Sequence, residues 1–400
     1  MKRNLIYMDA KSSKFWNIDH AGNSFTVKYG RIGTEGQSLT KSFPSEAAAA
    51  KEAESLIKEK LGKGYVDATT SATPSGEAAT AADDQIPLVA FSSINHSDDI
   101  HENIGTFIGR RVVDYDPEKA VKNDVVYRIR SDWESKAFSS NLEGFLESYA
   151  ALETTALVIG AWQGDDQSKA SDIVVEALVK AKDRLPKLAA LFIGDITSEE
   201  NEMSWINQSD LSPLFQAFPR LQLLRARGGE GLALATPEHN HLRALALETG
   251  GMDVSVIRSV CTSRFPNLEY LELWLGTEEY GANYAVADLQ PILSGELFPK
   301  LKYLGLRNCQ RADELAGVIV NSPLIQRIET LDLSLGVLTD EGARALLLLP
   351  LNTLKKLNLH YNYIGDDMIS ELRALPLSVD ASKPREMETD DEWRFVAVGE

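Results

Sequence analysis

The feature that most constrains the fold of this chain is a leucine pattern that recurs between residues 154 and 359. Each copy reads Leu-x-x-Leu-x-Leu, with Ile or Ala at some positions, and successive copies start 21 to 34 residues apart. The clear copies start at Leu188, Leu221, Leu242, Leu268, Leu301, Ile328 and Leu354, and a weaker one starts at Thr154. Such periods are typical of repeat architectures, in which each unit buries its apolar side only by stacking on its neighbours.

Two further signals recur in register with the leucines. A residue suited to a tight turn stands three positions beyond the last apolar residue of most copies. These residues are Gly229, Gly250, Gly276, Cys309, Gly336 and Asn362. Four copies are preceded by Leu-Pro or Phe-Pro, at residues 185–186, 218–219, 265–266 and 298–299. Proline cannot continue a helix and extends the residue before it, so each unit is predicted to be a helix, a proline stop and a short strand.

This pattern resembles the ribonuclease-inhibitor-like class of leucine-rich repeats over about residues 150–375. The resemblance implies an α/β solenoid with parallel strands at residues 151–375. The ends of such a stack need caps, and we assign residues 87–150 and 376–400 to an N-terminal and a C-terminal cap.

The first 67 residues have a different pattern. Apolar residues alternate near residues 4–9, 15–19, 25–31 and 38–43, which predicts four strands. Ser45 is placed to cap a helix that continues through the helix-forming residues 47–63. We therefore expect a small antiparallel sheet with one helix packed across it.

Residues 15–16, 27–37, 41–43 and 58–65 together resemble a WGR domain, and the match covers residues 1–67. WGR domains occur in poly-ADP-ribose polymerases and in bacterial proteins such as the molybdate metabolism regulator family. In the polymerases this domain helps to bind DNA breaks, and its Trp packs on a terminal sugar. The resemblance assigns a binding role to Trp16, Tyr29, Gly30, Arg31, Gly33 and Lys41. Tyr29 stands where the motif has Trp, while Gly30 and Arg31 match the motif.

Other interpretations of these residues remain open. Packing within the fold is favoured over ligand contact for Trp16 and Tyr29. Arg31 and Lys41 suit a phosphate or a partner carboxylate as well as an ion pair within the domain. The spacing of Gly30, Gly33 and Gly36 favours a tight hairpin over a phosphate loop.

Charge and composition separate the two parts of the chain. Residues 1–67 hold 11 Lys or Arg and 8 Asp or Glu, whereas the other 333 residues hold 30 and 51. Any nucleic acid should therefore bind the first part, because acidic surfaces repel polyanions. Residues 68–85 contain no aromatic residue, Lys or Arg, and we predict a flexible linker over residues 68–86.

The sequence offers little for catalysis or metal binding. The chain holds only two cysteines. His239 and His241 are separated by one residue, but they lack a nearby third ligand for a metal ion. The Asp114, Asp116 and Glu118 cluster around Pro117 is more typical of a turn than of a cation site. We find no GxSxG, HExxH or P-loop motif, no secretory signal and no apolar run long enough for a membrane. We therefore expect a monomeric cytoplasmic protein that is not an enzyme and needs no cofactor or metal.

Side chains alternate along a strand, so the residues between the repeat leucines should line the concave face of the sheet. Arg, Trp and Tyr dominate binding hot spots. The predicted partner-binding residues are Arg225, Arg227, Tyr270, Glu272, Trp274, Tyr303, Arg307, Asp332, Lys356 and His360.

Two functions remain after these exclusions. The first is a non-catalytic scaffold that binds a protein or peptide on the concave face, with the WGR-like domain as an accessory binding module. The second is a protein that binds or senses DNA ends through the WGR-like domain. A third possibility also remains, in which the concave face of the sheet is solvated and binds no partner.

Overall fold

The computed structural model places the chain in two compact units, residues 1–85 with 118–120 and residues 86–117 with 121–400. It describes residues 2–9, 12–31, 37–63, 66–67, 86, 102–122, 124–131, 137–164, 166–235, 237–386 and 394–399. The predicted linker, residues 68–86, lies outside the described residues except for Ile86. The two units are described separately below.

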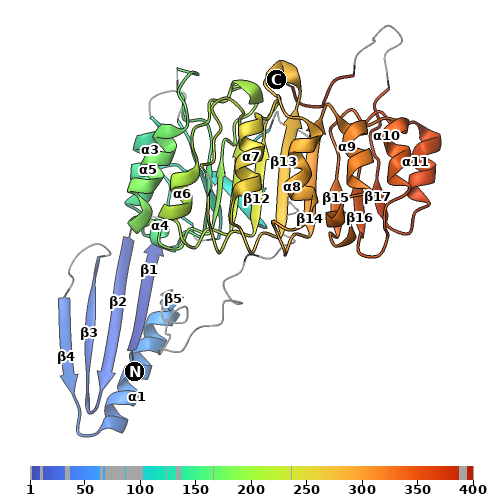
Figure 1. Cartoon of the computed structure of the whole chain (residues 1–400). Helices are drawn as coiled ribbons and strands as arrows, with labels where there is room; N and C mark the ends of the chain where they lie inside the picture. Colours follow the sequence, from blue (N-terminus) through green and yellow to red (C-terminus); the bar gives the residue numbers. More distant parts are fainter. Residues whose placement is uncertain are drawn as a thin grey trace. The chain divides into compact units, whose positions relative to one another are not determined.

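In its described residues, the first unit is an antiparallel sheet with strand order β4-β3-β2-β1-β5 and one helix (Figure 1). Its elements are β1 (Lys2–Asp9), β2 (Ser12–Ala21), β3 (Ser24–Arg31), β4 (Gln37–Ser42), α1 (Glu46–Gly62) and β5 (Val66–Asp67). The four strands and the helix predicted from the sequence are confirmed, and β5 adds a short fifth strand. Its core joins strand residues Trp16, Ile18, Phe25 and Val27 to Ala53 and Ile57 of the helix.

The described part of the second unit forms one sheet of twelve strands, and all neighbouring pairs from β7 to β17 are parallel. The first seven strands are β6 (Thr106–Phe107), β7 (Arg110–Asp114), β8 (Val126–Ile129), β9 (Ala156–Ile159), β10 (Ala190–Ile193), β11 (Leu223–Arg227) and β12 (Ala244–Glu248). The others are β13 (Tyr270–Gly276), β14 (Tyr303–Cys309), β15 (Thr330–Asp332), β16 (Lys356–Asn358) and β17 (Ser378–Asp380). The strands follow each other in sequence order across the sheet.

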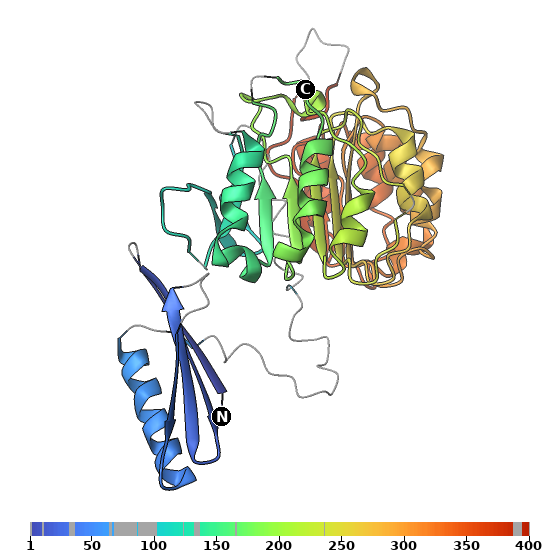
Figure 2. The same cartoon turned by 90° about the vertical axis from the view of Figure 1, so that its left-hand side faces the viewer.

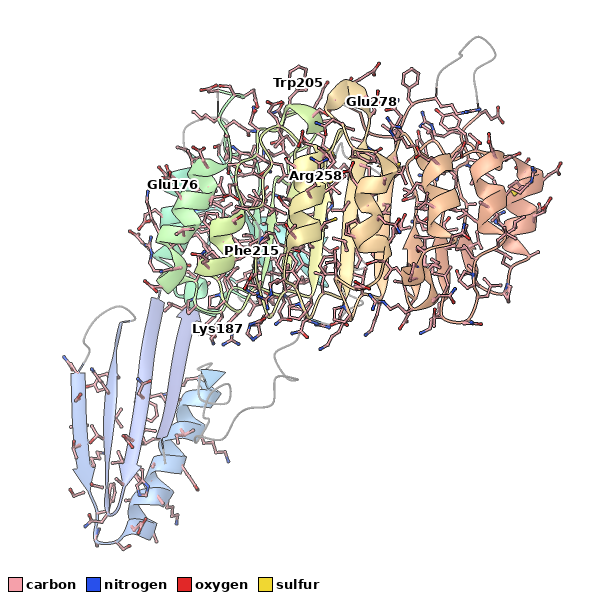
Figure 3. All side chains as sticks on the ribbon, in the orientation of Figure 1. Glu176, Lys187, Trp205, Phe215, Arg258 and Glu278 are labelled. Atoms are coloured by element: carbon pink, nitrogen blue, oxygen red, sulfur yellow. The ribbon has the colours of Figure 1, made fainter. Side chains whose placement is uncertain are left out.

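Helices connect most of these strands and lie along one side of the sheet, as Figures 1 and 2 show. The α-helices are α3 (Phe138–Leu146), α4 (Tyr149–Glu153), α5 (Asp172–Lys180), α6 (Ser212–Ala217), α7 (Val254–Thr262), α8 (Gln290–Leu293), α9 (Ala312–Ile319), α10 (Asp340–Leu346) and α11 (Asp366–Arg373). The 3₁₀ helices are η3 (Lys182–Arg184), η4 (Met203–Trp205), η5 (Glu278–Tyr280), η6 (Val286–Leu289) and η7 (Pro323–Gln326). Figure 3 shows the side chains on the ribbon, with Glu176 of α5 and Arg258 of α7 on the helical side.

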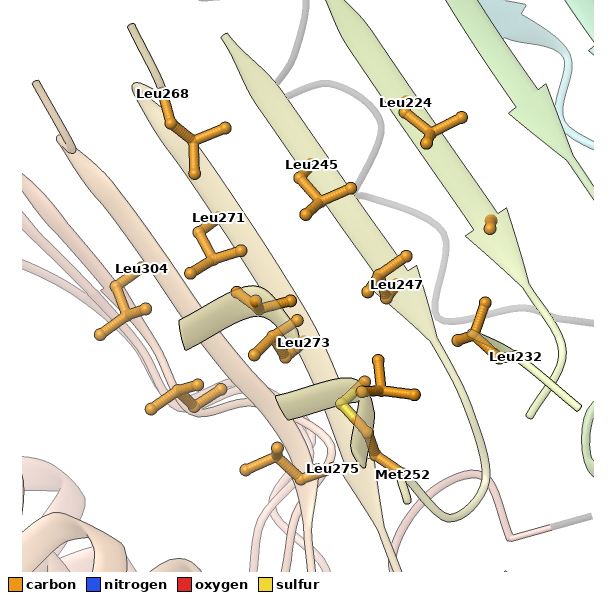
Figure 4. Close-up of a cluster of buried hydrophobic side chains, with 14 of the residues drawn as sticks. Leu224, Leu232, Leu245, Leu247, Met252, Leu268, Leu271, Leu273, Leu275 and Leu304 are labelled. Atoms are coloured by element: carbon orange, nitrogen blue, oxygen red, sulfur yellow. The ribbon is translucent and has the colours of Figure 1, made fainter. Parts of the chain in front are cut away.

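The repeat leucines pair with each other across the sheet. Leu245 is in register with Leu271, Leu271 with Leu304, and Leu304 with Leu331. All four are at most 1% exposed and belong to one hydrophobic core with residues of the helices (Figure 4). The three Phe-Pro exits also contribute, because Phe218, Phe265 and Phe298 are buried in the same core. The predicted stacking of leucines on adjacent parallel strands is therefore confirmed.

Candidate functional site

The side of the sheet away from the helices, called here the inner face, carries the residues that alternate with the core leucines. It includes Phe192, Leu223, Ala246, Tyr270 and Tyr303, which form a second hydrophobic cluster. The residues predicted to bind a partner lie on this face or at its carboxyl edge. The expectation that these side chains are exposed is wrong for Arg225, Arg227, Tyr270, Glu272, Trp274, Arg307 and Asp332, each at most 2% exposed, and for Tyr303 and His360, each 9% exposed.

Two arginines of β11 share one carboxylate of β12. Arg225 Nε lies 2.5 Å from Glu248 Oε1, and Arg227 Nε lies 2.9 Å from Glu248 Oε2. Burial would raise the pKa of Glu248, but the two guanidinium groups hold it below its usual value. Arg225 also stacks over the Phe192 ring, 4.3 Å from its centroid. Both arginines are therefore paired with a carboxylate and packed inside the protein.

A second cluster centres on Glu272 of β13. Its carboxylate accepts hydrogen bonds from Tyr270, from Trp274 Nε1 at 2.6 Å and from Arg307 Nη1 at 3.1 Å. Burial, opposed by Arg307, raises the pKa of Glu272. The cluster continues through Tyr303, whose hydroxyl donates to Asp332 at 2.8 Å and whose ring stacks on Tyr270 with centroids 3.9 Å apart.

Lys356 and His360 lie at the β16 end of this face. Lys356 is half-buried, and His360 Nδ1 lies 2.7 Å from Ser382 Oγ. His360 N donates to Asn358 Oδ1 at 3.1 Å, and Asn358 donates from its side-chain nitrogen to Asp332 at 2.8 Å. The β16 end of the predicted stripe is therefore connected to the Glu272 cluster through Asn358 and Asp332.

The chain itself covers part of the inner face. Ile86, Ile104, Phe107 and Ile108 pack into the same cluster as Phe192. Hydrogen bonds hold two of these residues in place: Ile86 N donates to Gln222 Oε1 at 2.9 Å, and Ile104 N donates to an oxygen of the buried Asp195 at 3.1 Å. The region predicted as an N-terminal cap thus supplies residues that lie over the inner face.

The last described residues, 394–399, cover the carboxyl ends of β13–β15. Asn308 donates from its side-chain nitrogen to the Val398 carbonyl and accepts from the Val398 N–H at 3.0 Å. Ala397 N donates to the Leu335 carbonyl at 2.8 Å, and Ser204 donates to the Gly399 carbonyl. Val398 is buried in a cluster with Met203, Trp274 and Leu335. Of these residues, only Trp274 was selected from the sequence.

Asn308 and Ser204 were missed because their roles depend on a segment that is distant in sequence. Asn308 does carry one local signal, since it precedes the turn residue Cys309 and has a φ of 53°. Asn tolerates this left-handed conformation better than most residues. Ser204 lies in η4, in a long connection that the repeat pattern does not describe.

The first unit presents its own candidate site. Trp16 is 6% exposed and in register with Tyr29, which is 40% exposed and therefore accessible. The Tyr29 hydroxyl donates to Gln37 at 3.3 Å. Leu39, 52% exposed, pairs with Val27, so it lies on the same sheet face as Tyr29. Lys41 is exposed on this face as well, opposite Phe25.

Two further positions carry a role assigned by the WGR resemblance: Gly33 and the side chain of Arg31 lie outside the described residues. Gly30 is half-buried at the end of β3.

The groups considered for catalysis or metal binding are engaged elsewhere. His239 Nε2 lies 3.1 Å from the Phe218 carbonyl, and its Nδ1 accepts from His241 N at 3.2 Å. Burial raises the pKa of both Cys261 and Cys309 to about 11, so neither is a thiolate at neutral pH. In the part of the chain that the structure describes, no group of three His, Cys, Asp or Glu is placed to hold a metal ion. None of the described helices is both long and apolar enough to cross a bilayer.

Comparison with protein families identifies a WGR domain at residues 1–72. Two Escherichia coli K12 proteins match this region: the uncharacterized protein YfeS and protein YehF, each 49% identical over 65 residues. Each match covers 16% of this chain, and 27% of YfeS or 24% of YehF. The chain thus spans about a quarter of the length of the curated relatives it matches.

A crystal structure of a Bacteroides fragilis protein matches over almost the full length. It is 31% identical in sequence, and the match covers 97% of this chain and 98% of that protein with a TM-score of 0.61. The similarity therefore includes both units and is not confined to the WGR domain.

Proposed function

The chain belongs to the same family as the Bacteroides fragilis protein of known structure, and we propose that it is a non-catalytic interaction protein. In this proposal a WGR domain is joined to a leucine-rich-repeat solenoid of the ribonuclease-inhibitor-like class, and the solenoid binds a protein or peptide partner on its inner face. The WGR domain serves as an accessory binding module.

The register of the leucines supports the assignment to leucine-rich repeats. Each of six strands from β11 to β16 places a repeat leucine in the same row, ending with Leu331 opposite Leu357. The turn position also behaves as that repeat class requires. Asn362 is 1% exposed, donates to the Leu333 carbonyl at 2.9 Å, and accepts from Leu338 N at 3.0 Å. It therefore bonds the backbone where the chain leaves the strand.

The observation that carries the binding proposal is that residues 394–399 are held at the carboxyl edge of the inner face, at the ends of β13–β15. The contacts combine a side-chain amide that bonds both backbone groups of Val398 with an apolar pocket for the Val398 side chain. Backbone hydrogen bonds supply affinity and side-chain pockets supply specificity in the recognition of extended peptides. The same edge carries Trp205, which is 62% exposed, next to Ser204. This edge is thus the surface best suited to a polypeptide partner.

The test is affinity capture with the full chain as bait, followed by mass spectrometry. We compare the native chain with Asn308→Gly, which removes the amide but tolerates the left-handed backbone. The matched control is Asn321→Ala, because Asn321 is exposed and bonds only locally to Gly317 among its described contacts. A partner that is lost with Asn308→Gly and kept with Asn321→Ala supports the proposal. Equal capture by all three chains contradicts it.

A second candidate function is binding of DNA ends by the WGR domain, and the exposure of Tyr29 favours it. Tyr29 stands where the family motif has Trp, and its ring shares a sheet face with the exposed Lys41. An exposed aromatic ring suits stacking on a sugar or base, and a cation on the same sheet face suits a phosphate.

This second candidate is tested by electrophoretic shift of nicked DNA at low salt. Tyr29→Ala and Lys41→Ala should each weaken binding, and the exposed helix residue Lys51 provides the control Lys51→Ala. Binding should also weaken steeply as salt rises. Absence of any shift by the native chain at low salt refutes the candidate.

The remaining parts of the proposal concern chemistry, assembly and location. We infer that the chain is not an enzyme, acts as a monomer and works in the cytoplasm without a cofactor. The hydrogen bond of His239 and the two free thiols, Cys309 buried and Cys261 half-buried, support the absence of catalysis and a reducing compartment. Sedimentation of the full chain at micromolar concentration tests the monomer, which a dimer mass would contradict.

A further inference from the structure

Residues 394–399 contact the second unit in the way that a ligand contacts a receptor. We propose that the carboxyl ends of β13–β15, with η4 and η5, form a recognition site for extended peptides of the pattern apolar-x-apolar-Gly. Residues 396–399 of this chain are then an intramolecular occupant that a peptide of the same pattern displaces. This inference deepens the proposed function, on which it rests for the existence of a peptide partner.

The first element of recognition is independent of the ligand's side chains. Asn308 bonds both the N–H and the carbonyl of Val398, and Leu335 accepts from Ala397 N at 2.8 Å. Any extended segment offers these same backbone groups. The side chain of Asn308 is completely buried, so its amide is held in place to form both bonds.

The second element is the pocket that receives Val398. Met203, Trp274 and Leu335 line it, and each is at most 2% exposed. The Trp274 ring is fixed on its other side, because its Nε1 donates to Glu272 and Arg307 lies 5.0 Å from its centroid. The buried Glu272 cluster therefore positions the wall of the pocket and need not contact the ligand.

The third element selects glycine after the pocket residue. A Cβ atom on Gly399 would lie 2.8 Å from a ring carbon of Tyr280. A Cβ atom on Gly250 would lie 2.2 Å from the Gly399 carbonyl oxygen. The site thus fits a ligand residue without a side chain, between the Tyr280 ring and the backbone at Gly250. The carbonyl of that residue is then held by Ser204.

The flanking residue Phe395 adds little apolar contact, since it is 53% exposed. Its backbone bonds the hydroxyl of Tyr363 at 3.3 Å, and Arg385 donates to its carbonyl. Val396 and Val398 are 6% and 4% exposed, so the two apolar positions of the pattern account for the buried side chains of the segment. A peptide that supplies this pattern can replace all of these contacts.

Tethering sets the affinity expected for a peptide in trans. An occupant on the same chain competes at an effective concentration in the millimolar range for a short flexible tether. The native chain should therefore bind an added peptide at least about tenfold more weakly than a chain whose own segment cannot enter the pocket. Val398→Asp creates such a chain, because a carboxylate is costly in an apolar pocket.

The experiment measures fluorescence anisotropy of a labelled peptide with the sequence of residues 394–400, RFVAVGE, added to purified full-length protein. We expect Val398→Asp to bind this peptide at least about tenfold more tightly than the native chain. The double variant Val398→Asp with Asn308→Gly should lose this increase in affinity for the peptide. The control peptide RFVAVVE, with Val in place of the glycine, should not bind.

A second variant protects the test against misfolding. Gly399→Val in the full chain expels the segment by contact with Tyr280 and leaves the pocket residues unchanged. The inference is overturned if a folded Val398→Asp or Gly399→Val chain does not bind RFVAVGE. It is also overturned if RFVAVVE binds equally, or if Asn308→Gly has no effect. This experiment uses purified protein and peptide, so it is independent of affinity capture from cells. If the peptide binds tightly but affinity capture finds no partner, the proposed partner is overturned and the peptide site is not.

Discussion

Arg307 and Glu272 form an ion pair on neighbouring strands, with nitrogen and oxygen 3.1 Å apart and side chains only 1% and 0% exposed. Both residues were selected from the sequence as partner-binding residues of an open face. Their burial changes what substitution does. A buried pair contributes little net stability, but removal of one member leaves the other charge unpaired in a region of low polarity.

The first prediction concerns this pair. Arg307→Ala should lower the free energy of unfolding by about 3–5 kcal/mol, because it leaves the buried Glu272 carboxylate without its ion-pair partner and opens a void beside Trp274. The matched control is Arg311→Ala, since Arg311 and Glu278 are 40% and 63% exposed at their side chains. That change should cost at most about 1 kcal/mol. Urea unfolding measures both, and similar losses for the two variants would contradict the burial of the pair.

The second prediction tests the leucine rows. Leu304 is 1% exposed and lies in register between Leu271 and Leu331. Leu304→Ala should lower the free energy of unfolding by about 2–5 kcal/mol, because the neighbouring strands cannot collapse into the space. Leu348 is 77% exposed, so Leu348→Ala should change stability by no more than about 0.5 kcal/mol. Denaturant unfolding measures both variants. A larger loss of stability for Leu348→Ala than for Leu304→Ala would refute the stacked core.

The third prediction concerns the turn position of the repeat. Asn362→Ala removes an amide that bonds the carbonyls of Leu333 and Leu359 and the N–H of Leu338. Buried backbone groups left without partners cost about 1–3 kcal/mol each, so a loss of at least about 2 kcal/mol is expected. Asn321→Ala on an exposed surface is the control. A thermal shift for Asn362→Ala as small as that of the control would show that this amide is not structural.

The fourth prediction is a pH dependence carried by His239. Burial lowers the pKa of His239 below 6.5, opposed by its hydrogen bond to Phe218. The unfolded chain therefore takes up a proton first as pH falls. The stabilising contribution of the neutral ring is present above pH 6.5 and declines below it, by at most about 1.4 kcal/mol per pH unit.

His239→Gln should remove this part of the pH dependence of stability. His241→Gln, two residues away and exposed, should keep it. Unfolding free energies measured at several pH values between neutral and mildly acidic compare the variants with the native chain. Parallel curves for the native chain and His239→Gln would exclude His239 as the source.

The strands and their register could be predicted because they depend on local spacing. The fixed spacing of leucines within each copy, a proline before four of the strands and a turn residue after most of them define the units without knowledge of the rest of the chain. The antiparallel strands around Trp16 follow in the same way from alternating apolar residues. Both inferences used periodicity, which reports burial directly.

The state of the inner face could not be predicted by the same reasoning. Alternation correctly places Arg225, Glu272 and Trp274 opposite the leucines, but it does not show what lies over them. The covering residues include Ile104 and Val398, in segments with no repeat pattern of their own. Contacts between such segments and the sheet span 90 or more residues, as for Asn308 and Val398. Sequence spacing carries no signal for them.

Hydrogen exchange at the backbone amides of Ala397 and Val398 tests the central claim, that the inner face holds an extended peptide, most directly. In the native chain these amides bond Leu335 and Asn308, so they should exchange much more slowly than in the free peptide RFVAVGE. Asn308→Gly should speed exchange at Val398. Exchange in the native chain as fast as in the free peptide would contradict the account.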